Sequence, residues 1–169
     1  NKGTVDELRF MARMVNATKA EAYRQSFDRG LAYVLKAQYA NGGWPQFFPL
    51  RKGYYDRITF NDGAMVRVLE FIREVGRDDR YGFVDAKIRE ACLQAFDRGI
   101  ACILKCQIVI DGQPTVWCAQ HDEKTFAPAK ARSYELPSFS GSESVGIVRL
   151  LMSLDNPSTE VRASVEGAV

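Results

Sequence analysis

Histidine is nearly absent from this chain, and long hydrophobic runs are absent altogether. The single histidine, His121, is accompanied by no second histidine and no CxxC pair, which argues against a zinc site. The longest apolar runs are broken by Lys, Arg or Gln well before they reach the length that crosses a membrane. With 169 residues, 46% of them hydrophobic and 26% charged, the composition is that of one folded domain with a sizeable core.

An excess of charge of either sign is also missing. The formal net charge is only +2 and there is no basic stripe, so the sequence does not favour a nucleic-acid partner. Cations are instead clustered in two segments, Arg51, Lys52 and Arg57 in the first and Lys124, Lys130 and Arg132 in the second. These side chains are either solvated loop cations or subsites for an anionic ligand, because arginine pairs with carboxylates in bidentate fashion.

A CxxC motif is also absent. The four cysteines are Cys92, Cys102, Cys106 and Cys118, and no two of them form a CxxC motif. Cys102 and Cys106 lie one helical turn apart among apolar neighbours and are predicted to be small buried residues. A disulfide from Cys92 or Cys106 to Cys118 remains open, so the cysteines do not settle the redox compartment.

Apolar residues recur at helical spacing through most of the chain. We expect five helices, with apolar stripes within residues 8–15, 27–38, 65–72, 88–104 and 145–152. A further helix is expected to start at Asn156-Pro157, with Asn156 as its cap and Pro157 at its first position. Two long loops rich in glycine, proline and aromatic residues lie at 39–60 and 108–143, and the second is compatible with a hairpin around Asp111-Gly112.

An internal repeat organises these helices. Residues 27–38 match residues 96–107 almost position for position, and a loop containing Trp44 or Trp117 follows each copy. A second helix then starts near Asn61 in one copy and near Glu143 in the other. Units of helix, long loop and helix cannot bury their apolar faces alone. We therefore predict an all-α fold in which the units stack into an α/α toroid, with the long loops gathered at one end.

The ends of the chain do not coincide with the ends of the repeat. Residues 1–4, followed by Leu8 and Phe10, look like the second helix of a still earlier copy, and the last helix looks like the first helix of another unit. Residues 1–169 are therefore expected to be a single domain segment that is truncated at both ends. Because Asn1 is not an initiator methionine, the lack of a signal-peptide pattern is uninformative.

Oxygen ligands for a hard cation are better represented than nucleophiles. Residues 142–146 miss the nucleophile-elbow pattern because Ser142 stands where glycine is needed. Asn61 and Asp62 stand at the start of a helix, whereas Asp122 lies in the second long loop. Together with Glu143, the repeat equivalent of Asn61, these oxygen ligands suit calcium. The alternative is that Asn61 or Asp62 caps its helix and that Asp122 is solvated. The repeat favours a metal site, because it places these groups at one end of the toroid.

Aromatic side chains surround the acids in the sequence. Five precede Asn61 and one precedes Asp122, namely Trp44, Phe47, Phe48, Tyr54, Tyr55 and Trp117. Aromatic faces stack on sugars or bases, and cations beside them suit an acidic ligand. The alternative is that the same rings anchor the loops or fill the core.

Several stretches of the chain resemble the signature blocks of family 10 pectate lyases. They are residues 37–51, residues 54–62, and residues 116–122 with their continuation through 131–135 to 140–146. The resemblance spans essentially the whole chain in order. It implies an α/α toroid, calcium dependence, β-elimination of polygalacturonate or pectin, and secreted or periplasmic action. We further expect a monomer that contacts neither nucleic acid nor membrane. One departure is Gly63, where the family usually carries a second acid.

Roles for individual residues follow from this resemblance and from the loop composition. The candidate metal ligands are Asp62, Asp122, Asn61 and Glu143. The candidate substrate-binding residues are Trp44, Arg51, Lys52, Tyr55, Arg57, Trp117 and Lys130. The family uses arginine as the base, and Arg132 is the candidate within the chain, although we would look for the base in a block beyond Val169. Arg132 otherwise binds a carboxylate or forms a structural ion pair.

Two other functional classes compete with an active lyase. The spacing of Gln38 and Trp44 also resembles the Gln-Trp repeats of terpene cyclases, in which these residues tie helices together, but the Asp-rich motif of such enzymes is missing. The other alternative is a non-catalytic uronate-binding module, which would bind its ligand in the presence of calcium without turning it over.

Overall fold

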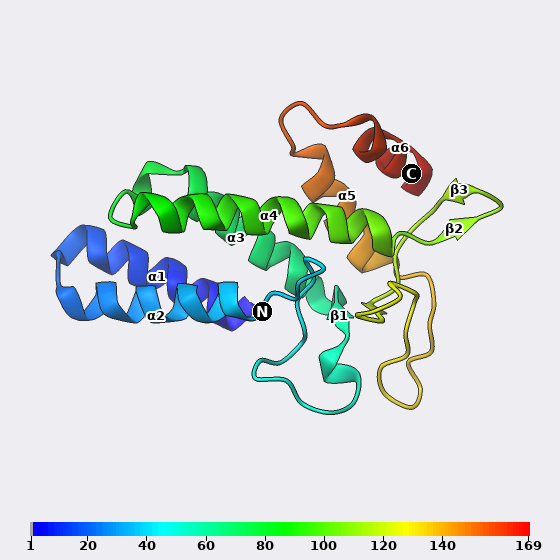
Figure 1. The fold of residues 1–169 in the computed structure, drawn as a ribbon, viewed down its shortest axis with the longest axis horizontal. Coiled ribbons are helices and arrows are strands. Elements are labelled where there is room, and N and C mark those ends of the chain that lie inside the picture. The colour runs from blue at the N-terminus through cyan, green and yellow to red at the C-terminus, as the bar shows by residue number, and fades with distance from the viewer. Residues whose placement is uncertain (1) are drawn as a thin grey trace.

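The computed structural model describes residues 2–169, and these residues form an all-α fold, as predicted (Figure 1). The helices are α1 (Lys2–Thr18), α2 (Glu21–Lys36), α3 (Ala64–Arg77), α4 (Ala86–Cys106), α5 (Gly141–Met152) and α6 (Thr159–Ala168). Short 3-10 turns cover Tyr54–Asp56, Asn61–Gly63 and Asp79–Tyr81. Asn1, which the sequence analysis assigned with residues 2–4 to the helix of an earlier copy, lies outside the described residues.

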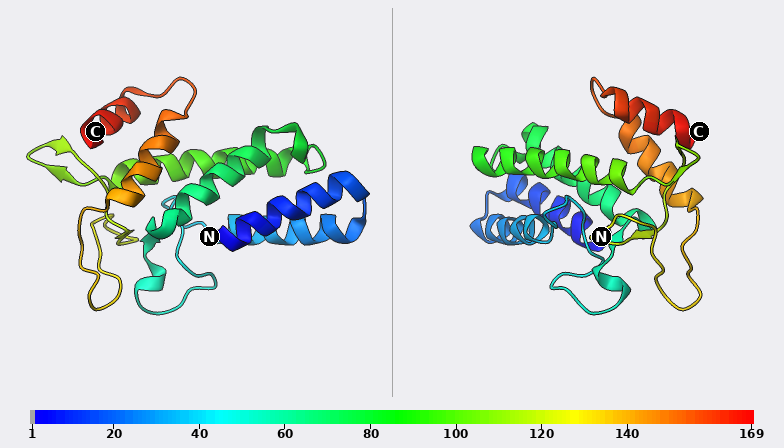
Figure 2. Two further views of the ribbon diagram at one scale, coloured as in Figure 1. Left: turned by 180° about the vertical axis from the view of Figure 1, so that it is seen from behind. Right: turned by 45° about the vertical axis from the view of Figure 1, so that its right-hand side comes forward.

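The helices form the double layer of an α/α toroid (Figure 2). They pack in consecutive pairs, α1 with α2, α3 with α4 and α5 with α6. In one layer α1 contacts α3 and α3 contacts α5, and in the other α4 contacts α6. The first layer thus contains the second helices of the predicted units, α1, α3 and α5, and the other layer contains first helices such as α4 and α6. The repeat predicted from the sequence is therefore confirmed.

The repeated glutamine and tryptophan make equivalent contacts in both copies. The Trp44 indole N–H donates to the Val34 carbonyl at 2.9 Å, and the Trp117 indole N–H donates to the equivalent Ile103 carbonyl at 2.8 Å. Gln38 and Gln107 each donate to a backbone carbonyl on the first helix of the next unit. The acceptors are Ala95 on α4 and Ser164 on α6, each at 2.8 Å. The helix-tying role expected of Gln38 and Trp44 is therefore confirmed.

The two long loops meet at one end of the helices, as predicted. Strand β1 (Ile58–Thr59) of the first loop pairs antiparallel with β4 (Gln120–His121) of the second. The backbone N–H groups of Phe60 and Asn61 both donate to the Ala119 carbonyl, at 2.8 and 3.0 Å. The second loop also contains the expected hairpin, formed by β2 (Val109–Ile110) and β3 (Gln113–Pro114) around Asp111 and Gly112.

Two helix starts differ from the sequence predictions. Helix α6 is capped by Ser158, whose hydroxyl accepts the Val161 N–H at 3.3 Å, whereas Asn156 adopts a left-handed φ of 52°. The expected start at Asn156-Pro157 was therefore wrong by a few residues. At α3 the cap position is Gly63, and neither Asn61 nor Asp62 bonds to the first turn through its side chain, so the capping interpretation of these residues is also wrong.

All four cysteines are free and buried, which excludes the disulfide to Cys118 that the sequence left open. The hydrogen bond with Cys102 and burial raise the pKa of the Cys106 thiol. Cys92 has a pKa raised to about 12 by burial alone. These thiols fill space in the core and are not poised to react.

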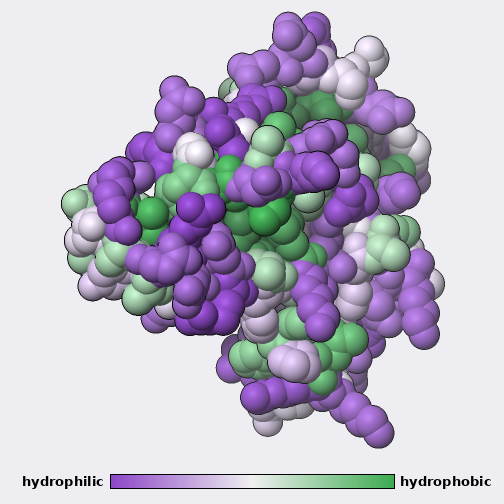
Figure 3. Space-filling view, turned by 60° about the vertical axis from the view of Figure 1, so that its left-hand side comes forward, coloured by the Kyte–Doolittle hydropathy of each residue, from purple (hydrophilic) through white to green (hydrophobic). Residues whose placement is uncertain are grey.

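Hydrophilic side chains cover most of the face shown in Figure 3, and hydrophobic residues show as separate patches in the recesses between them. Several large apolar side chains of the second long loop are exposed, namely Tyr134, Leu136 and Phe139. No helix within residues 2–169 combines the length and the hydropathy that a membrane span requires.

Candidate functional site

An acid cluster forms where the first turns of α3 and α5 meet at the loop end. The Asp62 backbone N–H donates to Glu143 Oε1 at 3.2 Å, and the Asn61 side-chain amide donates to Asp62 Oδ2 at 2.9 Å. The Ser140 hydroxyl donates to the other oxygen of Glu143. The backbone reaches this arrangement through two left-handed residues, Asp62 and Gly63, with φ of 54° and 66°. Asn61 and Glu143, equivalent in the repeat, thus lie at one end of the helices, as predicted, and both contact Asp62.

Asp122 lies in a separate arrangement, in the turn that follows β4. Its Oδ1 accepts the backbone N–H groups of Lys124 and Thr125, both at 3.0 Å, and its Oδ2 forms an ion pair with Arg57. The hydrogen bonds from Thr125 and Lys124, together with the Arg57 charge, lower the pKa of Asp122 to about 2.

Within residues 2–169, no three His, Cys, Asp or Glu side chains come close enough to hold a metal ion. The predicted ligand set of Asn61, Asp62, Asp122 and Glu143 is therefore wrong as one preformed group, because Asp122 is engaged elsewhere. The turn in residues 122–125 has no counterpart in the helical repeat, which is why the repeat did not place Asp122 correctly. Asp62, Glu143 and Asn61 remain together.

Arg57 joins the two long loops. Its guanidinium pairs with Asp122 and also lies 3.5 Å from the Glu123 carboxylate, although Arg57 belongs to the first loop and both acids to the second. The Asn41 side chain donates to the Glu123 carbonyl and adds a second link between the loops. Arg57 therefore forms a structural ion pair between the loops, and its role in binding substrate stays a prediction.

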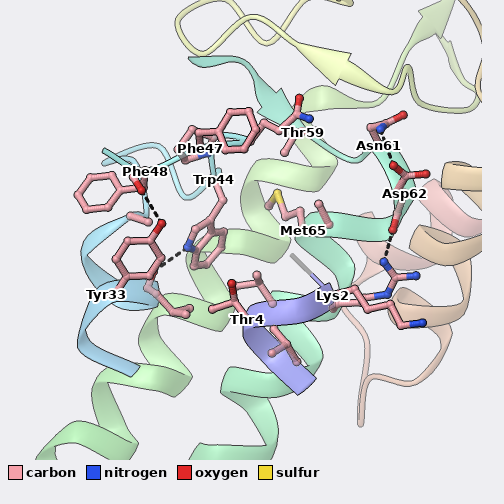
Figure 4. Close-up of a pocket in the computed structure, with 18 residues that line it drawn as sticks. Lys2, Thr4, Tyr33, Trp44, Phe47, Phe48, Thr59, Asn61, Asp62 and Met65 are labelled. Carbon is pink, nitrogen blue, oxygen red and sulfur yellow. Dashed lines mark hydrogen bonds between the residues drawn. The ribbon is translucent and has the colours of Figure 1, made fainter. Parts of the chain in front are cut away.

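A pocket of about 460 Å³ opens beside the acid cluster (Figure 4). Aromatic residues line one side of it, namely Tyr33, Trp44, Phe47 and Phe48. Met65 and Val68 of α3 contribute apolar lining, whereas Asn61 and Asp62 lie at the opposite side from the aromatic rings. Lys2 and Arg67 add two cations on this polar side. The pocket therefore combines an apolar surface with both acidic and basic groups, a mixture suited to a sugar acid and a cation.

Comparison with known proteins identifies the family. The sequence pattern of the family described as "Pectic acid lyase" matches residues 1–169. This chain belongs to the pectic acid lyase family. The terpene-cyclase alternative is thereby excluded, although the tying role it assigned to Gln38 and Trp44 holds. No curated protein matches the chain.

Two solved structures of family 10 polysaccharide lyase from Cellvibrio cellulosa are similar to this family member. One is the enzyme itself, and the other is an aspartate-to-alanine mutant in complex with trigalacturonic acid. Each is 35% identical to the chain, with a TM-score of 0.90 over 98% of its residues. The match covers 52% of the Cellvibrio chain, so the present sequence spans about half the length of these relatives.

The aromatic residues of this pectic acid lyase homologue that were predicted to bind substrate differ in their exposure. Trp117 is 0% exposed, so its assignment to substrate stacking is wrong, and its ring serves the core. Trp44 lines the pocket but is only 4% exposed, because its indole N–H is tied to Val34. Tyr55 remains partly exposed in a stack with Tyr54 and Phe47, with ring centroids 4.1 and 5.0 Å apart.

The predicted loop cations divide into free and committed groups. Lys52 and Lys130 are exposed, and Arg51 is exposed while its guanidinium lies 5.0 Å from the Phe47 ring centre. Arg132 is held by Glu135, whose carboxylate accepts both the Arg132 backbone N–H, at 3.0 Å, and its guanidinium. This carboxylate raises the pKa of Arg132, which opposes the role of base and agrees with the ion-pair alternative.

Residues that sequence reasoning missed include His121 and Arg67. His121 is fully buried, its Nε2 accepts the Cys118 N–H at 3.1 Å, and its Nδ1 lies 2.7 Å from the Phe126 carbonyl. Burial lowers its pKa, so the ring is neutral and structural. Arg67 follows Gly63 by one helical turn and lines the pocket, a spacing that could have flagged it once Asp62 was considered functional.

Proposed function

We propose that this chain is part of a pectate lyase that cleaves polygalacturonate by calcium-assisted β-elimination. Membership of the pectic acid lyase family and similarity to a lyase that binds trigalacturonic acid support this proposal. The observation that carries it is the cluster of Asp62, Glu143 and Asn61, of which Asp62 and Asn61 line a pocket that also contains aromatic and cationic groups. Since its substrate is a plant-wall polysaccharide, we also propose that the protein is secreted or periplasmic.

The acid cluster fits calcium as a partial site. Calcium takes about six to eight oxygen ligands, and Asp62 and Glu143 supply two carboxylates beside the Asn61 amide oxygen. Because no third acid lies close enough within residues 2–169, the remaining ligands would be uronate carboxylates and water. Binding of calcium and of an acidic sugar would then depend on each other.

The chemistry follows from the position of the acidic group in the sugar. In a galacturonate unit the C5 proton lies next to the C6 carboxylate, and the C4 oxygen is the leaving group. A calcium ion on that carboxylate would stabilise the negative charge that develops as a base accepts the C5 proton; the C4–C5 double bond then forms and the C4–O bond breaks. The exposed cations Arg51, Lys52 and Lys130 would hold further carboxylates of the polymer, and Asp62 and Glu143 would position the reacting unit.

A non-catalytic uronate-binding module is the second candidate. The ion pair between Arg132 and Glu135 favours it, because the base candidate within the chain keeps its proton more firmly than a free arginine does. Such a module would keep the acid cluster and the pocket, and it would bind oligogalacturonate without breaking it.

Formation of the C4–C5 unsaturated uronate, followed by its ultraviolet absorbance, separates the two candidates. The assay uses polygalacturonate at alkaline pH, with calcium and then with chelator. We expect a rise in absorbance that stops on chelation and is lost in Asp62→Asn. Binding of polygalacturonate without any rise would overturn the lyase proposal for this chain and support the binding module.

A further inference from the structure

Arg67 lies beside the acid cluster and has no acidic partner among residues 2–169. Its side chain is partly buried at the polar side of the pocket, and one guanidinium nitrogen donates to the Asp62 carbonyl, the bond drawn at Asp62 in Figure 4. That bond fixes the guanidinium against the α3 start. Within residues 2–169 the group forms no ion pair, and its Nε and Nη2 have no hydrogen-bond partner.

Gly63 leaves room for a ligand at this guanidinium. A Cβ built on Gly63 would lie 3.7 Å from the Arg67 Cζ and 3.9 Å from Nη2, and apart from the adjacent residues its three nearest atoms all belong to this guanidinium. An acidic residue at position 63 would therefore place its carboxylate on Arg67 and neutralise it. With glycine at this position, the free guanidinium N–H groups remain available to a carboxylate that enters the pocket.

We propose that Arg67 is a specificity-determining residue that binds one free carboxylate of the uronate chain and discriminates against its methyl ester. This inference rests on the proposed function and names the form of substrate that the site selects. A methyl ester carries no charge and offers the guanidinium only a weak acceptor, so the charge-assisted bidentate bond is lost. The lone Lys2 on the same side of the pocket adds positive charge but lacks the planar fork of arginine.

The test compares binding of trigalacturonate with binding of its methyl ester by titration calorimetry, in excess calcium, for the whole 169-residue chain. Arg67→Gln should weaken binding of the free acid by about tenfold and change binding of the ester by less than about twofold. Gly63→Asp should have the same effect, because it supplies an internal carboxylate to Arg67. Gly63→Asn, which has the same shape and tolerates the left-handed φ equally well, should keep the wild-type ratio.

The outcomes separate this inference from the proposed function. If Arg67→Gln weakens binding of acid and ester equally, Arg67 serves only to hold the Asp62 backbone, and the inference is overturned. An unchanged ratio in both Arg67→Gln and Gly63→Asp overturns it as well. A wild-type chain that binds neither ligand contradicts the proposed function itself, and the role of Arg67 fails with it.

Discussion

Burial decides what the single histidine does. His121 is enclosed between β1 and the turn after β4, where both ring nitrogens have backbone partners and the Phe60 ring lies edge-on at 5.5 Å. A protonated ring would present an N–H to the Cys118 N–H, two donors facing one another. The residue therefore fixes the loop that contains Asp122, and it does so only while it is neutral.

Stability should consequently fall on mild acidification. The folded pKa of His121 is lowered by burial, so as pH drops through the ordinary value of 6.5 the unfolded chain takes up a proton before the folded chain does. We expect the melting temperature of the wild-type chain to fall between about pH 7.5 and pH 5.5, and His121→Gln to show a smaller fall. Thermal unfolding followed by circular dichroism measures both; parallel curves would show that His121 does not titrate in this way.

The ion pair of Arg57 also acts at the residue scale. Because it links the two long loops, Arg57→Gln should loosen their contact, including the hydrogen bonds from Phe60 and Asn61 to Ala119. Hydrogen exchange measured by mass spectrometry should become faster in residues 58–61 and 117–126 and remain unchanged in α4. Arg24→Gln, which removes an exposed pair within α2, is the control. Equal exchange in the two variants would contradict the linking role.

The helix-loop-helix unit is the element that the sequence reveals most fully. Residues 27–38 and 96–107 repeat because the same glutamine and tryptophan contacts must be made in each unit, so the order of the helices and the meeting of the loops could be predicted. The start of α6 could not, since Ser158 and Asn156 are both good caps and packing of α6 against α4 and β3 determines which is used.

The glutamine ties should contribute measurably to stability. Gln107 is buried and donates to the Thr115 and Ser164 carbonyls at 2.7 and 2.8 Å, so Gln107→Leu leaves two acceptors without partners. We expect the free energy of unfolding to fall by about 1–3 kcal/mol. Gln94→Leu on the exposed face of the same helix should change it by less than about 0.5 kcal/mol. Urea unfolding compares the two; similar losses would mean that the ties are not stabilising.

Across the whole molecule, the double layer of helices brings the acid cluster, the pocket and the exposed cations to one end. The sequence predicted this end and the presence of both Asn61 and Glu143 there, because both follow from the repeat. It did not predict that Asp122 pairs with Arg57, and it left open whether Trp117 stacks on a ligand or fills the core, because the long loops follow no period that fixes which side chains face inward. The residue types favoured the proposed acidic-sugar site, and the fold of the loops determines which of these residues lie there.

Calcium-dependent binding of trigalacturonate tests that site most directly. Titration calorimetry is performed with calcium and with chelator, on the wild-type chain and on Asp62→Asn. We expect the wild-type affinity to fall at least about tenfold on chelation, and the Asp62→Asn affinity to be low and insensitive to calcium, because one of two carboxylates is lost. Equal wild-type affinity in calcium and chelator, or unaltered calcium dependence in Asp62→Asn, would show that the cluster of Asp62, Glu143 and Asn61 is not the uronate site.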